Sequence, residues 1–122
     1  MTEDVIHKEL TGSIISSAIR VLSKLKPGLD EKIYENALVI ELLKRGHRIE
    51  QQKEFRVHYE EKLVGRLIPD LIVDDKVIVD PKVVVAFNEY HIAQMTGYLA
   101  ITGLPLALLL NFKYTKLQIK RV

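Results

Sequence analysis

The sequence predicts an α/β fold in which a mixed central sheet is flanked by helices. Apolar residues recur at helical spacing near both ends of the chain, whereas the middle alternates between apolar and polar residues or forms short apolar runs. Tight turns in the middle force antiparallel pairs of strands, and a helix late in the chain permits a parallel crossover. The expected order of elements is ααβββαββ.

Length and composition narrow the class of protein. The chain has 122 residues, 48% of them hydrophobic, so we expect one domain over residues 1–122 with a substantial core. The 18 basic and 16 acidic residues leave a net charge of +2, which supports nucleic-acid binding only weakly. Cysteine is absent, which excludes disulfides, thiolate chemistry and cysteine-based zinc sites. We expect a cytoplasmic protein without a membrane span, because no apolar run is long enough and the N-terminus lacks a signal-peptide layout.

Two helices are expected in the first third of the chain. The first covers residues 10–25 and ends where lysine, proline and glycine follow one another. Proline disfavours helix in the residue before it, and glycine tolerates left-handed backbone angles. The second covers residues 30–44, and its apolar spacing predicts that Ile33, Ala37 and Ile40 face inward.

Five strands are expected, over residues 55–59, 63–73, 77–85, 104–110 and 117–122. The first alternates apolar and charged residues, which is typical of a strand with one solvent-exposed face. The run that starts at Val77 and the run that starts at Leu104 are apolar on both faces, so both are predicted to be buried central strands.

Charged side chains surround the predicted central hairpin. Asp70 lies at the end of one strand, and Asp80 and Lys82 lie on the next. Because side chains alternate along a strand, Asp80 and Lys82 share a face, and a strand spacing of about 4.8 Å brings Asp70 within reach. Two carboxylates so placed can share Mg²⁺, which would polarise a phosphate and acidify a water, while the lysine stabilises developing charge. Solvated turn residues or surface ion pairs are the alternative interpretation.

Two helices carry further polar candidates. Glu31 lies at the start of the second helix. The alternative interpretation is that an acid at this position complements the positive end of the helix dipole and has no other function. A third helix, expected over residues 88–101, carries a polar stripe of His91, Gln94 and Tyr98. The stripe is either a polar face over a site or the solvent side of the helix. The apolar side of that helix would consist of Ala93, Gly97 and Ile101.

An ordered series of motifs extends along almost the whole chain. Residues 28–34 fit the signature GxxExxY. The signature is followed, in order, by Gln51-Gln52, Tyr59, Pro69-Asp70, the strand with Asp80 and Lys82, His91-x-x-Gln94, Tyr98-Leu99 and Leu109-Leu110-Asn111-Phe112. Each piece is weak by itself, but the ordered set is specific. Over residues 8–122 the sequence resembles the GxxExxY family, which is grouped with the PD-(D/E)XK nuclease superfamily.

The resemblance implies a restriction-endonuclease-like core with a Mg²⁺ or Mn²⁺ site. It implies Glu31, Asp70 and Asp80 as metal ligands, Lys82 as the catalytic lysine and Gln94 as a polar residue close to that lysine. The implied function is a metal-dependent nuclease that hydrolyses phosphodiester bonds of DNA or RNA by a metal-activated water. Many nucleases of this type act as symmetric pairs, so a homodimer is expected.

Two positions depart from the family pattern. The family usually has glutamate in place of Asp80, whose carboxylate reaches one methylene less, and an aliphatic residue in place of Pro81. Proline cannot donate to a sheet ladder, so the backbone near Asp80 is expected to be bulged or at the end of its pairing, with Lys82 displaced. The alternative function is therefore a catalytically silent member that binds nucleic acid or a protein partner. A purely structural interaction module ranks third.

Overall fold

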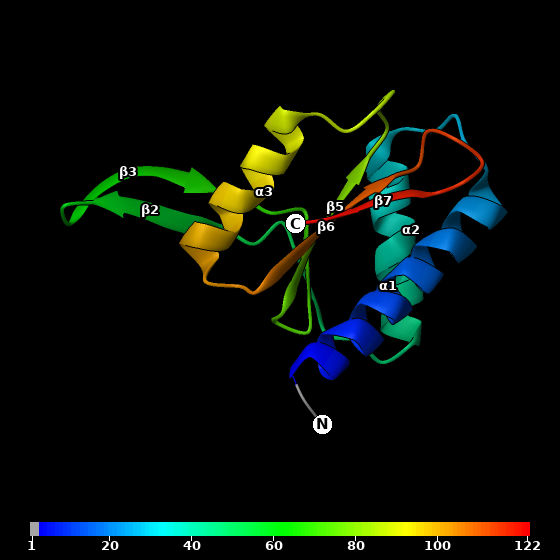
Figure 1. The fold of residues 1–122 in the computed structure, drawn as a ribbon, viewed down its shortest axis with the longest axis horizontal. Coiled ribbons are helices and arrows are strands. Elements are labelled where there is room, and N and C mark those ends of the chain that lie inside the picture. Colours follow the sequence, from blue (N-terminus) through cyan, green and yellow to red (C-terminus); the bar gives the residue numbers. More distant parts are fainter. Residues whose placement is uncertain (1–2) are drawn as a thin grey trace.

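The computed structural model describes residues 3–122, and Figure 1 shows the arrangement of their helices and strands. The helices are α1 (Glu3–Leu25), α2 (Glu31–Lys44) and α3 (Glu89–Thr102). The strands are β1 (Ile49–Gln51), β2 (Phe55–Tyr59), β3 (Lys62–Leu67), β4 (Leu71–Val73), β5 (Val77–Lys82), β6 (Leu106–Asn111) and β7 (Gln118–Arg121). Among the described helices, none is long and apolar enough to cross a membrane.

The central sheet has the strand order β1-β4-β5-β6-β7. β5 and β6 pair in parallel, and the other three neighbouring pairs are antiparallel, so the sheet is mixed. α3 connects the two parallel strands, which need a long crossover. The predicted fold class is confirmed, and so are the two buried central strands, because Val77–Val79 and all of β6 are buried.

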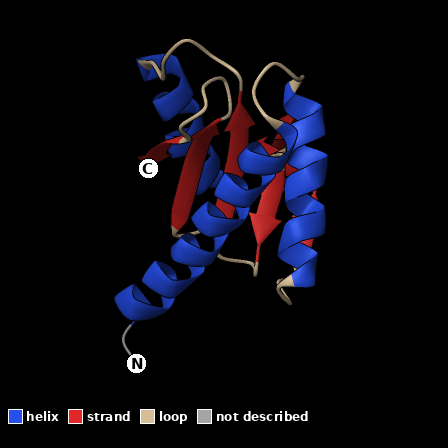
Figure 2. Cartoon of the chain, turned by 90° about the vertical axis from the view of Figure 1, so that its right-hand side faces the viewer, coloured by secondary structure: helices blue, strands red, loops and turns tan. Residues whose placement is uncertain are grey.

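Helices cover both faces of this sheet. α1 and α2 lie on one face, and Figure 2 shows them in front of the strands. The core under α1 and α2 includes Leu71, Val73, Val77 and Val79. The core under α3, on the other face, includes Ile72, Ile78, Met95 and Leu109. Successive side chains of β4 and β5 thus enter different cores, which explains why these strands are apolar on both faces.

The β2–β3 hairpin forms a separate two-stranded arm that projects from the sheet (Figure 1). The prediction of one continuous return strand over residues 63–73 is wrong. The chain leaves the ladder at residues 68–70, where Pro69 lacks the amide hydrogen that a continuous ladder requires. β1 was not predicted, because three residues are too few to show a period. The order is therefore ααβββββαββ, with two strands more than expected.

The inward face predicted for α2 is wrong for two of its three residues, because only Ala37 packs against the core. Ile33 is 44% exposed and Ile40 is 60% exposed. The buried residues of this helix are Tyr34, Glu35, Leu38 and Leu42. The ring of Tyr34 stacks on Phe112 with the centroids 4.8 Å apart. Because α2 carries apolar residues on most of its circumference, this tertiary contact, rather than spacing, decides which side faces the sheet.

The apolar side predicted for α3 is also wrong. Ala93, Gly97 and Ile101 are exposed, whereas Met95 is buried. Alanine and glycine bury little area, so the larger side chains of this helix gain more by facing the sheet. The polar stripe of His91, Gln94 and Tyr98 is only partly exposed. The stripe is therefore not the solvent side of the helix.

Candidate active site

Asp70 and Asp80 face each other across two neighbouring strands. β4 and β5 pair with Leu71 opposite Val79, and the same register continued by one residue places Asp70 opposite Asp80. Residues opposite each other in an antiparallel pair have their side chains on the same face, a few ångströms apart. The two carboxylates are close enough for Asp70 to raise the pKa of Asp80. The structure thus brings together the two acids that the sequence pattern singles out.

The carboxylate of Asp80 is buried beside one lysine. Asp80 is 5% exposed, and its Oδ2 lies 3.3 Å from Lys82 Nζ. Burial raises the pKa of Asp80 to about 7, with Lys82 opposing the shift and Asp70 adding to it. Its Oδ1 is buried without a hydrogen-bond partner. A buried acceptor without a partner costs about 1–3 kcal/mol, and two adjacent carboxylates need either a shared proton or a cation.

Pro81 lies between Asp80 and Lys82 without displacing either. β5 keeps its register with β6 through Lys82, without a bulge. The amide of Phe112 donates to the carbonyl of Lys82, so the backbone of Lys82 faces β6 and that of Pro81 faces the β4 side. Pairing with β4 has already ended at Val79, and the missing amide hydrogen removes no ladder bond. The expected end of pairing is therefore present, but the expected displacement of Lys82 is wrong.

α3 places Gln94 and Tyr98 near the carboxylates. Gln94 Nε2 donates to the Tyr98 hydroxyl at 3.3 Å. Burial raises the pKa of Tyr98, and the charges of Asp80 and Asp70 raise it further. Gln94 is thus linked to the acids through Tyr98. Tyr98 was expected in one polar stripe with His91 and Gln94, and the effect of Asp70 and Asp80 on its pKa supports the interpretation of this stripe as a polar face over a site.

Glu31 contacts the backbone that directly follows Lys82. Its Oε2 accepts a hydrogen bond from the backbone amide of Val83 at 3.2 Å, so Glu31 holds the segment that follows Lys82. In the described part of the chain, no three histidine or acidic side chains form a group that could hold a metal ion. The place of Glu31 in a metal shell therefore stays a prediction.

Glu35, one turn further along α2, is connected to Asp70 instead. Glu35 is 4% exposed, and its Oε2 accepts a hydrogen bond from Gln52 Nε2 at 3.1 Å. The same nitrogen donates to Asp70 Oδ1 at 3.1 Å. Gln51 Nε2 and Lys32 Nζ also donate to Glu35 Oε2, at 2.6 and 2.9 Å. Glu35 thus orients Gln52, and Gln52 orients Asp70.

Sequence reasoning missed this bridge for an identifiable reason. An acid in the first turns of a helix is already explained by the helix dipole. Two of the hydrogen bonds to the buried Glu35 come from Gln51 and Gln52, which lie 16 and 17 residues away in the sequence. The available signal was the pair of adjacent glutamines in the ordered motif series.

The tyrosine of the GxxExxY signature shapes the loop before α2. The buried Tyr34 hydroxyl donates to the carbonyl of Lys26 at 2.6 Å and accepts from the amide of Leu29 at 3.1 Å. The enclosed loop contains Gly28 at φ 109°, a backbone angle that favours glycine. Gly28 and Tyr34 of the signature therefore fix the conformation of the loop. The loop in turn determines that α2 begins at Glu31.

Asp70 and Asp80 are the side chains that could hold a divalent cation. Mg²⁺ in proteins is commonly bound by one or two carboxylates and several waters. The unpartnered Oδ1 of Asp80 and the effect of Asp70 on its pKa fit such an ion, which would take the place of a shared proton. The residues present therefore fit the group that the resemblance implies.

The mixed sheet between two helical layers, with paired acids and a lysine at the end of its central hairpin, defines a nuclease-like α/β protein. The chain belongs to the PD-(D/E)XK nuclease superfamily, whose family model matches residues 8–122. Nucleases of this superfamily generally depend on divalent metal ions. No curated protein and no solved structure matches the chain.

Proposed function

We propose that this protein is a metal-dependent nuclease that hydrolyses phosphodiester bonds of DNA or RNA. The observation that carries the proposal is the buried Oδ1 of Asp80, which has no hydrogen-bond partner and lies beside a second carboxylate and a lysine. Such a site holds negative charge that its own side chains neutralise only in part, which is what a cation site requires. Assignment to the GxxExxY family within the superfamily is part of the proposal and rests on residues 28–34.

The proposed roles follow from the positions of the side chains. Asp70 and Asp80 hold Mg²⁺ or Mn²⁺, and Gln52 keeps the carboxylate of Asp70 oriented toward the site. An ion held there would supply the charge that polarises the scissile phosphate and acidifies a water molecule. The ammonium group of Lys82 is not a ligand for Mg²⁺, so it remains free to donate hydrogen bonds from Nζ to the phosphate oxygens as negative charge develops on them. Glu31 and Gln94 complete the proposed catalytic set.

The arrangement of Lys82 supports catalysis over the silent alternative. Lys82 Nζ lies 3.3 Å from the buried carboxylate of Asp80, so a phosphate bound at this site would be within reach of a charge-stabilising donor. The net charge of +2 and the proline before Lys82 favour the silent alternative, but this proline leaves the strand in register. We therefore treat the silent binder as an alternative that the experiment described next can establish.

The test joins metal binding to cleavage. Calorimetric titration with Mn²⁺ should give heat with the wild type and much less with Asp70→Asn, which removes one of two ligand charges. Asp75→Asn is the matched control, because it removes the same charge from an exposed turn residue paired with Arg48. Equal heats from the wild type and Asp70→Asn would remove Asp70 from the metal shell. Nucleic-acid affinity without cleavage in Mg²⁺ or Mn²⁺ would establish the silent binder.

A further inference from the structure

The basic side chains are distributed unevenly along the chain. Residues 1–89 carry 14 basic and 16 acidic side chains, whereas residues 90–122 carry four basic side chains and no acidic one. The four are Lys113, Lys116, Lys120 and Arg121. They occupy the β6–β7 connection and β7, and residues 113–121 are here called the C-terminal basic segment. The overall charge of +2 conceals this local excess of positive charge.

The four cations are exposed and available. All four are exposed, and β7 is an edge strand of the sheet. In the part of the chain that the structure describes, none of the four forms an ion pair. Several other basic side chains are occupied: Arg48 binds Asp75, for example, and Lys53 binds Glu50. An anion can therefore bind the C-terminal basic segment without displacing an internal carboxylate.

The chain that leaves Lys82 is fastened to the chain that enters this segment. The side chain of Asn111 accepts from the amide of Val84 at 3.1 Å and donates to its carbonyl at 2.7 Å. The hydroxyl of Tyr114 donates to the carbonyl of Val85 at 2.8 Å. These contacts hold the basic segment beside the residues that directly follow the lysine of the candidate active site.

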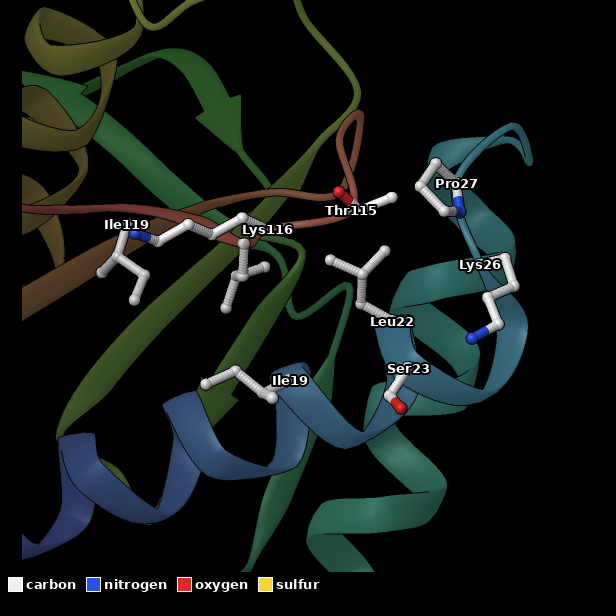
Figure 3. A pocket seen from close by; sticks show the side chains of 9 residues that line it. Ile19, Leu22, Ser23, Lys26, Pro27, Thr115, Lys116 and Ile119 are labelled. Carbon is white, nitrogen blue, oxygen red and sulfur yellow. The ribbon is translucent and has the colours of Figure 1, made fainter.

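Two clefts give access to the basic segment from both sides. One, of about 490 Å³, lies between α1 and residues 115–119, and Figure 3 shows Lys116 on one side of it and Lys26 on the other. The second, of about 610 Å³, lies between Phe87 and residues 114–119. Lys116 lines both clefts, so this lysine is accessible from both sides of the segment.

We propose that the C-terminal basic segment binds the sugar-phosphate backbone of the nucleic acid that is cleaved at Asp70 and Asp80. The identity of the partner rests on the proposed function, but binding can be measured without cleavage. Duplex DNA carries one negative charge per about 1.7 Å of its axis, and lysines contact phosphates without reading base sequence. The segment thus anchors the substrate next to the catalytic residues and leaves sequence preference to other parts of the protein.

The experiment measures the affinity for a fluorescent DNA duplex in EDTA at several salt concentrations. The variant combines Lys113→Gln and Lys116→Gln, and the control combines Lys24→Gln and Lys44→Gln. The control removes the same charge from two exposed lysines of the α1–α2 layer. Each lost phosphate contact should lower the slope of log affinity against log salt by about 0.9, so the variant should lose about 1.8 and the control nothing. Thermal unfolding should show both proteins folded.

Three outcomes overturn the inference. A wild-type slope in the variant would show that the segment does not contact phosphates. An equal loss in the control would show that only overall charge matters. Displacement of the duplex by polyglutamate at equal charge concentration would point to an acidic protein partner. These outcomes are separate from the nuclease proposal: a chain that never cleaves but shows the expected slopes refutes the nuclease and keeps the binding surface.

Discussion

Asp80 is a carboxylate whose charge depends on its neighbours. Burial and Asp70 favour its protonated form, whereas Lys82 favours the ionised form. A bound divalent cation would add a much larger preference for the ionised form than one lysine supplies. The protonation of Asp80 and the binding of metal should therefore compete at the same oxygens.

This competition has a consequence for stability in EDTA. The pKa of Asp80 is raised from its ordinary value of 3.8 to about 7, so the folded protein binds more protons than the unfolded chain between these pH values. The free energy of unfolding should then fall as pH rises from about 4 to about 7 and level off above that, by at most a few kcal/mol. Asp80→Asn has no such titration, so the Tm of this variant should exceed the wild-type Tm above pH 7 more than near pH 4. Parallel curves of Tm against pH would contradict the raised pKa.

Lys82 separates an enzyme from a binder. Lys82→Ala should reduce metal-dependent cleavage about a hundred- to a thousand-fold, the usual effect of removing one charge-stabilising donor, and should leave the heat of Mn²⁺ binding nearly unchanged. Lys82→Arg should not restore the rate, because guanidinium is larger and its donors form a rigid fork. A loss of Mn²⁺ binding in parallel with the rate would instead show that Lys82 acts by holding Asp80 in place.

Residues in one local strand pair could be placed from the sequence, and residues from different layers could not. Asp70, Asp80 and Lys82 were expected together because strand alternation and a short turn fix their positions. The proximity of Glu35 and Tyr98 depends on how α2 and α3 pack on the sheet. No pattern within either helix contains that information.

Elements follow the same rule. The bounds of α2, α3 and β6 were predicted within two residues, because their apolar patterns are long enough to show a period. By contrast, α1 begins at Glu3 rather than at residue 10, and β5 ends at Lys82 rather than at residue 85. The inward faces of α2 and α3 were not predicted correctly, since both helices carry apolar residues on several sides. The break between β3 and β4 was missed because the apolar pattern continues through it, although the backbone pairing does not.

Strand β5 carries the element-scale prediction. Pro81→Leu, which introduces the residue type usual in the family, should leave the cleavage rate unchanged, because Lys82 is already in contact with Asp80. Rates of the wild type and the variant in Mg²⁺ should be compared together with their Tm values. A clear gain in rate at equal Tm would mean that the proline holds Lys82 away from its working position.

For the whole molecule, the remaining prediction is a homodimer. One small sheet provides a short groove, so cleavage of both strands of a duplex needs two copies related by symmetry. Light scattering should give about twice the chain mass of 14.0 kDa. A monomeric mass at micromolar concentration, in the presence and absence of duplex, would contradict the prediction and leave single-strand cleavage as the expected product.

The two prolines of the hairpin determine where the sheet opens. In the register of β4 and β5, Pro69 falls opposite Pro81, one residue beyond the facing pair Asp70 and Asp80. Pairing at that step would need each residue to donate an amide hydrogen to the other, and neither proline has one. The hydrogen-bonded ladder between β4 and β5 therefore cannot extend beyond the two acids, whichever side chains occupy positions 70 and 80. The two prolines therefore fix the opening between the strands, and this opening would remain in a protein in which other residues had replaced both aspartates.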